Sequence, residues 1–141
     1  MFYMILSKNA ISKALEANKL NIRPFDIKNL KEASYTFTLS DKIKSGNQEL
    51  IIGEDGYILK PGEFALVYSE EELDLRNNYC CILSARGSVA QAGINVLLGS
   101  NFCEPDTNGR ITIEIHNTST QDYKLEKGMA IMKGIFEEML S

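Results

Sequence analysis

The stretch Arg110-Ile111-Thr112-Ile113-Glu114-Ile115-His116-Asn117 (RITIEIHN, residues 110–117) decides the fold class of this chain. Isoleucines alternate with polar residues, and successive side chains of an extended strand point to opposite faces. We therefore predict a half-buried β-strand whose three isoleucines face a core. Its other face carries Thr112, Glu114 and His116. That face is either wetted sheet surface or the wall of a pocket in which Glu114 does chemistry.

The rest of the chain also contains short runs rich in β-branched and aromatic residues. Turn signals such as Pro61-Gly62 and Lys127-Gly128 separate these runs, which read SYTFTLS, ELII, YILK, EFALVYS, YCCILS, INVLL, DYKLE and GMAIMKGIF. Many short strands of this kind are typical of a sandwich, jelly roll or barrel. We predict a mostly β fold.

Two segments have a helical pattern instead. Residues 8–18 are predicted to form a helix, with Ser7 as N-cap and apolar residues at helical spacing. The small residues of ARGSVAQAG (85–93) predict a short buried helix at 86–92 that Gly93 ends. The acidic run SEEELD (69–74) is most simply a solvated loop.

Composition narrows the class of protein. With 141 residues, 44% of them hydrophobic, the chain is expected to form a single domain over residues 1–141 without disulfides or protein-bound metal. A net charge of −4 without a basic stripe argues against nucleic acid as a partner. The chain has no apolar run of about 20 residues and no secretory signal pattern, so we expect no membrane partner and a cytoplasmic location. The three cysteines form no CxxC pattern, and adjacent Cys80 and Cys81 would face opposite ways along a strand.

Six segments, in order, resemble the deoxycytidine triphosphate (dCTP) deaminase and dUTPase family. They are ILSKNAISKAL (5–15), EASYTFTLS (32–40), LKPGEFAL (59–66), ARGSVAQAG (85–93), LLGSNFCEPDTNGRITIEIHN (97–117) and LEKGMAIMKGIF (125–136). The resemblance implies a dUTPase-like fold, a β-clip or distorted jelly-roll barrel with one N-terminal helix and one short buried helix. It also implies a homotrimer with shared sites and a deoxynucleotide substrate, dCTP or dUTP.

In the resembled family, the residue at the position of Glu114 is the general acid and base of deamination. The resemblance implies no protein-bound metal, and Mg²⁺ enters bound through the nucleotide triphosphate. A carboxylate between strands suits the shuttling of a proton from water to a leaving amine. The residues alone leave a second interpretation of Glu114 open. It could be an exposed strand residue paired with a side chain across the sheet, because Glu is usually exposed.

The resemblance also assigns substrate-binding positions. Arg86, with Gly87, Ser88 and Gln91, falls where the family holds substrate phosphates, which suits a planar guanidinium fork. An interface salt bridge is the alternative for Arg86. The other substrate-binding candidates are Ser100, Glu104, Thr112 and Ile113.

Two of the remaining assignments stay open. Glu104 stands where the family carries an Asp near the deoxyribose, and the alternative is a loop residue that holds the turn before Pro105. His116 either tunes Glu114 or is hydrogen-bonded at a subunit contact.

Several departures bear on activity. Gly87 and Gln91 replace a Ser and an Arg of the family, Leu97 and Ser100 replace a His and an Ala, and no family tail follows GIFEEMLS. We expect a divergent dCTP deaminase-like enzyme. The alternatives are a dUTP pyrophosphatase, an inactive nucleotide-binding or regulatory trimer, and a protein-interaction module that presents SEEELD and NTSTQD (117–122).

Overall fold

The structure is a computed structural model that describes residues 4–140. At nine and five residues, its two α-helices are too short to traverse a bilayer. The elements are α1 (Lys8–Glu16), β1 (Asn21–Arg23), the 3₁₀ turn η1 (Ile27–Asn29), β2 (Tyr35–Ser45), β3 (Gln48–Ile51), β4 (Tyr57–Leu59), β5 (Phe64–Asp74), β6 (Tyr79–Ala85), α2 (Gly87–Gln91), β7 (Ile94–Val96), β8 (Phe102–Cys103), β9 (Asn108–Asn117), β10 (Tyr123–Leu125) and β11 (Ala130–Glu138).

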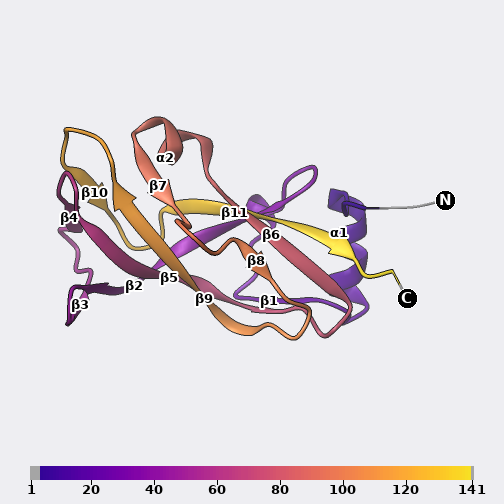
Figure 1. Cartoon of the computed structure of the whole chain (residues 1–141). Helices are drawn as coiled ribbons and strands as arrows, with labels where there is room; N and C mark the ends of the chain where they lie inside the picture. Colours follow the sequence, from indigo (N-terminus) through magenta and orange to yellow (C-terminus); the bar gives the residue numbers. More distant parts are fainter. Residues whose placement is uncertain (1–3, 141) are drawn as a thin grey trace.

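One curled antiparallel sheet dominates the molecule (Figure 1). Seven of its nine strands follow the order β7-β9-β5-β2-β11-β6-β8, while β1 pairs with β5 and β3 with β2. A second sheet consists of β4 and β10. Helix α1 and the end of β11 lie at one end of the molecule, and β3, β4 and β10 lie at the other (Figure 1). The predicted mostly β fold is confirmed.

The central strands separate a core face from an outer face. Ile43 on β2 pairs with Val67 on β5, which pairs with Ile113 on β9, and all three side chains are buried. One residue along each strand, Lys44, Leu66 and Glu114 form the neighbouring row. Because side chains alternate along a strand, this second row faces away from the core. The strand predicted from residues 110–117 is confirmed, with its isoleucines buried as expected.

The first helix forms as predicted. The hydroxyl of Ser7 accepts a hydrogen bond from the backbone N–H of Ala10, which is the expected N-cap contact. Ile11 and Ala14 are buried against the core. The helix ends at Glu16, two residues before the predicted boundary.

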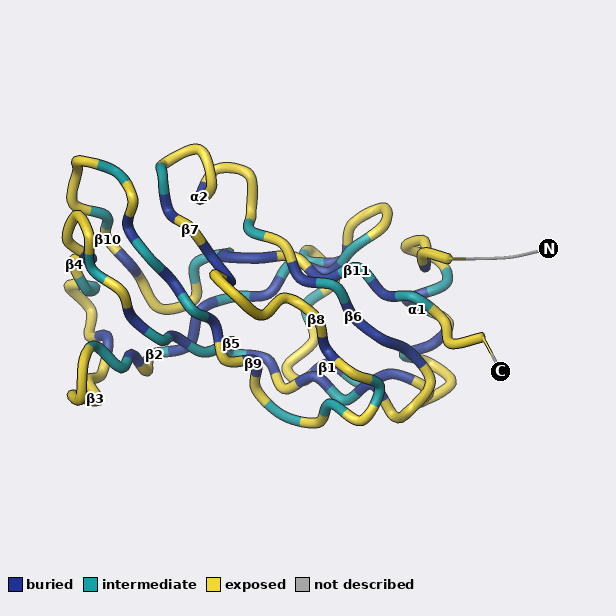
Figure 2. Tube along the Cα trace, viewed as in Figure 1, coloured by how far each residue is buried: buried dark blue, intermediate teal, exposed yellow. Residues whose placement is uncertain are grey.

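The second helix lies where it was predicted, but it is not buried. Only Val89 of α2 is buried, and Figure 2 shows most of this turn as exposed. Its small residues leave little apolar surface to cover, so a single buried side chain anchors the turn. Gly93 follows with φ of +82°, and a Cβ there would lie 2.9 Å from the Cβ of Ser119. Both facts explain glycine at the helix end.

The acidic run 69–74 is strand, and the prediction of a solvated loop is wrong. These residues form the second half of β5, paired with β1 and β9. Ser69, Glu71 and Leu73 point inward and are buried, whereas the acids between them face outward. The many acidic residues suggested a loop, although buried and outward-facing side chains alternate along this run with the period of two that is typical of a strand. This also removes Glu71 from the contact surface that an interaction module was expected to present.

Candidate functional site

Glu114 lies in the middle of β9, between β5 and the end of β7. Its backbone carbonyl accepts a hydrogen bond from the N–H of Leu97 at 2.6 Å. The side chain is half-buried, and its Oε1 is a buried oxygen without a hydrogen-bond partner among residues 4–140. Other buried side-chain oxygens and nitrogens of that region have partners, so this atom stands out. A carboxylate oxygen kept from water and unpaired is available to a ligand.

The outer face around Glu114 is apolar and aromatic. Leu66 lies directly opposite Glu114, and Tyr68 lies opposite Thr112, one step further along the same two strands. On the other side of Glu114, His116 pairs with Phe64, whose side chain is 48% exposed. Apolar and aromatic side chains of β5 thus flank the carboxylate on the outer face, and such side chains can pack against a planar ligand.

The chain bends sharply next to Glu114. Leu97 follows β7 with φ of +66°, a left-handed conformation that a leucine rarely adopts. Strained non-glycine residues of this kind concentrate at functional sites. Beyond the bend, Leu98 and Ser100 lie on an exposed loop. No residue pattern distinguishes this leucine from its neighbours, so sequence reasoning missed the bend.

Arg86 lies immediately before α2, and its side chain is exposed. Its guanidinium is near Tyr123, where burial raises the pKa of the phenol and the charge of Arg86 opposes that rise. Among residues 4–140, no hydrogen bond or ion pair joins Arg86 to Glu114. The neighbouring candidates Gly87, Ser88 and Gln91 are also exposed. These groups form an accessible polar turn at the start of α2.

Glu104 belongs to a turn at the far end of β9. Its carbonyl accepts a hydrogen bond from the N–H of Thr107, and the turn is tied to the β5–β6 connection by the bond from Leu75 N to the Thr107 carbonyl. The Glu104 side chain is exposed. Ile113, by contrast, is fully buried in the core, so only its backbone could contact a ligand on the outer face. The structure therefore brings Thr112, Glu114 and His116 together and leaves Glu104 apart from them.

The side chains that could bind a metal ion are scattered, apart from one pair of cysteines. No cluster of three or more His, Cys, Asp or Glu side chains suited to a metal ion occurs among residues 4–140. Cys81 and Cys103 lie directly opposite each other on β6 and β8 as free thiols. The facing Cys103 thiol and burial raise the pKa of Cys81, whereas the facing Cys81 thiol lowers the pKa of Cys103. Sequence spacing did not suggest this pair, because 21 residues of chain separate its members.

Two further residues of the site region escaped sequence reasoning. Tyr68 and Lys44 share the outer face with Glu114, and aligning EFALVYS with RITIEIHN in antiparallel register would have found the first. Lys44 needed the pairing of β2 with β5, which no local pattern specifies.

The curled sheet and its helices belong to the class of dUTPase-like folds. The structure matches the crystal structure of the 2'-deoxycytidine 5'-triphosphate deaminase from Agrobacterium tumefaciens with a TM-score of 0.84 and 16% identity. That match covers 99% of this chain and 49% of the other, so the chain spans about half of that deaminase. The dUTPase of phage phi11 of S. aureus matches with a TM-score of 0.62 and 12% identity, over 86% of this chain and 91% of that one. The predicted dUTPase-like fold is confirmed.

Sequence comparison then defines the family. The dCTP deaminase-like family model matches residues 46–139, and the chain belongs to this family. A dUMP-forming dCTP deaminase of Hydrogenobaculum sp. (strain Y04AAS1) is 28% identical over 148 residues, or 96% of this chain and 83% of that protein. Its namesake in Tropheryma whipplei (strain Twist) is 28% identical over 156 residues, or 98% of this chain and 80% of that protein.

Proposed function

We propose that this protein hydrolytically deaminates a deoxycytidine nucleotide, with Glu114 as general acid and base. The observation that carries the proposal is the buried, unpartnered Oε1 of Glu114 on a face with Leu66 and Tyr68. A carboxylate without an internal partner is free to accept a proton from water. Membership of the dCTP deaminase-like family supports the choice of substrate.

The proposed reaction uses one carboxylate for two proton transfers. Glu114 takes a proton from water as the water oxygen bonds to C4 of cytosine, and passes it to N3. It then takes the hydroxyl proton of the tetrahedral intermediate and delivers it to the amino nitrogen. The C4–N bond breaks, ammonia leaves and the C4 carbonyl of uracil forms. No protein-bound metal takes part in these steps.

The remaining contacts follow from the outer face. Leu66 and Tyr68 provide an apolar floor for the base and sugar, and Thr112 offers a hydroxyl beside Glu114. Ser100 and Glu104 remain candidates for the base and deoxyribose ends. Arg86 and Ser88 would contact phosphates, and Mg²⁺ would arrive with the triphosphate as part of the substrate.

A homotrimer with shared sites is part of the proposal. We assign Arg86 and Glu114 to neighbouring protomers because the resembled family shares its sites in this way, and because no hydrogen bond or ion pair joins the two residues within residues 4–140. The exposed Phe64 on the Glu114 face is available for contact with such a neighbour. Sedimentation velocity measures the assembly directly, and a monomer at micromolar concentration would contradict it.

The main experiment incubates the purified protein with deoxycytidine and deoxyuridine mono-, di- and triphosphates, and follows ammonia, pyrophosphate and nucleotide products. Glu114→Gln is expected to abolish ammonia release while the oligomer persists. Glu16→Gln, which removes an exposed carboxylate at the end of α1, is the matched control and should retain full activity. Ammonia release by Glu114→Gln at the parent rate would refute the assigned role. Pyrophosphate release from dUTP without ammonia would favour a dUTP pyrophosphatase. Nucleotide binding without any product would favour an inactive nucleotide-binding regulator.

Mixed oligomers test the shared site. Inactive Glu114→Gln chains and Arg86→Ala chains are mixed and allowed to exchange subunits. If each site takes Glu114 from one protomer and Arg86 from the next, about a quarter of the sites regain both residues. No recovery, despite verified exchange, would mean that both residues serve a site within one chain or that Arg86 is dispensable.

A further inference from the structure

A basic hollow opens on the outer face of the sheet, next to the candidate site, with which it shares Lys44 and Tyr68. Its volume is about 500 Å³, and its lining includes Lys42, Lys44, Glu49, Ile51, Tyr68 and Arg110. We propose that this basic hollow binds the phosphate chain of a nucleotide whose base lies at Glu114. The inference rests on the proposed function, but its first test does not require catalysis.

The charge of the basic hollow is the first argument. Two lysines and one arginine line it against one carboxylate, in a protein whose net charge is −4. The two ion pairs found among residues 4–140 are Lys28–Asp26 and Lys124–Glu126, so neither involves these cations. Arg110 gives one hydrogen bond from Nε to the Glu70 carbonyl at 3.4 Å and keeps its other donors free. In the strand register Glu49 lies opposite Lys44 and Glu72 lies opposite Arg110, but within residues 4–140 neither carboxylate forms an ion pair with these cations. A group of cations that no ion pair neutralises favours an anionic ligand.

The place of the basic hollow is the second argument. Lys44 pairs with Leu66, which pairs with Glu114, so the three side chains form one row on one face. Because adjacent strands are about 4.8 Å apart, the α-carbons of Lys44 and Glu114 are about 10 Å apart. Arg110 lies four residues before Glu114, or about 14 Å along the same strand at about 3.4 Å per residue. A nucleoside triphosphate extends over a comparable length from base to terminal phosphate.

The surface between the two ends is the third argument. Leu66 and Tyr68 occupy the interval between Glu114 and the basic hollow, and Tyr68 also lines the hollow. An apolar and aromatic floor suits a base and a sugar, whereas the cations suit the phosphates that follow them. Along the face, the carboxylate of Glu114 is followed by apolar and aromatic side chains and then by cations. The base, sugar and phosphates of a nucleotide follow one another in the matching order. Arg86 of a neighbouring protomer would add to these contacts.

The first test measures binding of inorganic tripolyphosphate by calorimetry at low salt and at 0.15 M salt. The Lys44→Gln/Arg110→Gln double variant is compared with Lys133→Gln, which removes an exposed lysine on β11. All proteins are also made with Arg86→Gln, so that binding at Arg86 is subtracted. We expect the double variant to bind at least about tenfold more weakly in both backgrounds, with the control unchanged. Equal affinity in the double variant, at a preserved melting temperature, overturns the proposal.

The second test uses turnover. Lys44→Gln should raise KM for dCTP about tenfold and leave KM for deoxycytidine and kcat nearly unchanged, because the lost contact is to phosphate only. An equal effect on all substrates would overturn the proposal, since it would point to a role at the base. If tripolyphosphate binds at the hollow but no nucleotide is deaminated, the proposed function fails and the anion site stands. If dCTP is deaminated without any dependence on Lys44 or Arg110, the anion site fails and the function stands.

Discussion

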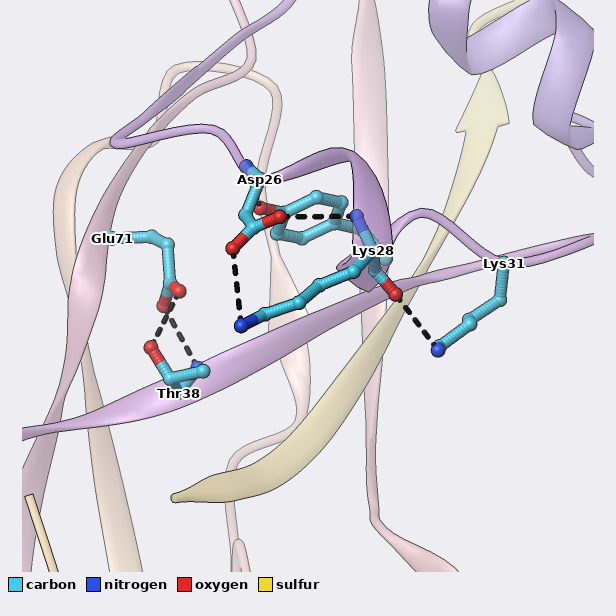
Figure 3. Close-up of polar contacts among 6 residues, drawn as sticks. Asp26, Lys28, Lys31, Thr38 and Glu71 are labelled. Atoms are coloured by element: carbon cyan, nitrogen blue, oxygen red, sulfur yellow. Dashed lines mark hydrogen bonds and ion pairs between the residues drawn. The ribbon is translucent and has the colours of Figure 1, made fainter. Parts of the chain in front are cut away.

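Thr38 on β2 donates two hydrogen bonds to the carboxylate of Glu71 on β5. The backbone N–H reaches Oε1 at 2.9 Å and the hydroxyl reaches Oε2 at 2.6 Å (Figure 3). Glu71 lies inside the register shift of β5 against β9, between Tyr68 and Glu72. At this irregularity, the carboxylate takes the place of a backbone acceptor for Thr38. A buried acid thus stabilises the joint between two long strands.

Removing this acceptor should destabilise the fold. Glu71→Ala leaves the N–H and hydroxyl of the half-buried Thr38 without their acceptor, which we expect to lower the free energy of unfolding by about 2 kcal/mol. Glu71→Gln keeps one oxygen for the N–H and can donate to the hydroxyl, so it should cost less. Urea unfolding of the two variants measures the difference. Equal losses would show that side-chain volume matters more than the hydrogen bonds.

Glu71 should also make stability depend on pH. Burial raises the pKa of Glu71 above its ordinary value of 4.5, although the hydrogen bonds from Thr38 oppose this. The folded state therefore favours the protonated acid, and this contribution is present below 4.5 and lost as the pH rises through the raised pKa. Relative to Glu71→Gln, the wild type should lose stability over that interval. A parallel pH dependence of the two proteins would contradict the raised pKa.

Asn117 should be a stability residue rather than a ligand contact. Its buried side chain donates to the carbonyls of Leu59 and Gln121 and accepts from the N–H and hydroxyl of Ser119. Asn117→Ala should lower the free energy of unfolding by about 3 kcal/mol, because several buried groups lose partners together. Asn95→Ala, at an exposed position on β7, is the matched control and should stay within about 0.5 kcal/mol of the wild type.

Glu114 should lower the stability of the unliganded protein. Burying an unpaired carboxylate oxygen is unfavourable, so Glu114→Met is expected to raise the free energy of unfolding by about 1 kcal/mol while it abolishes catalysis. Chemical denaturation at one fixed protein concentration measures the change without reference to activity. A loss of stability would mean that Oε1 finds a partner in solution, for example from a neighbouring protomer.

Cys103 should be the more reactive member of the thiol pair. The facing thiol of Cys81 holds the pKa of Cys103 below its ordinary value of 9.0, although Cys103 is buried. Alkylation followed by mass spectrometry should therefore modify Cys103 before Cys81. Cys81→Ala removes the facing thiol and should move the half-modification pH of Cys103 upward, whereas Cys80→Ala should not. The same half-modification pH in both variants would exclude the Cys81 thiol as the cause.

Local alternation was enough to predict most strands, because burial on one face leaves a period of two in the sequence. It predicted β9 and the core position of its isoleucines. It failed at residues 69–74, where Glu71 is buried only because Thr38, 33 residues earlier in the chain, satisfies its carboxylate. Composition cannot report a partner that distant. The exposed state of α2 was missed for a related reason, since small residues fit either a crowded interior or an open turn.

The family resemblance proposed residues for the candidate site, but it could not give their geometry. The family resemblance named Glu114, yet the unpartnered Oε1 and the left-handed bend at Leu97 emerge only from the packing of β7 against β9. Lys44 joins the site through two successive strand pairings, each set by long-range register.

The two adjacent rows across β2, β5 and β9 have a consequence for how this protein can diverge. Ile43, Val67 and Ile113 anchor the fold from one side of the pleat, while Lys44, Leu66 and Glu114 occupy the other. Substitutions in the second row can alter ligand preference without disturbing the first. A one-residue insertion or deletion next to Leu66 that no β-bulge absorbs would move Leu66 and Val67 to opposite faces of the sheet. Replacement of side chains therefore disturbs this part of β5 less than a change of its length.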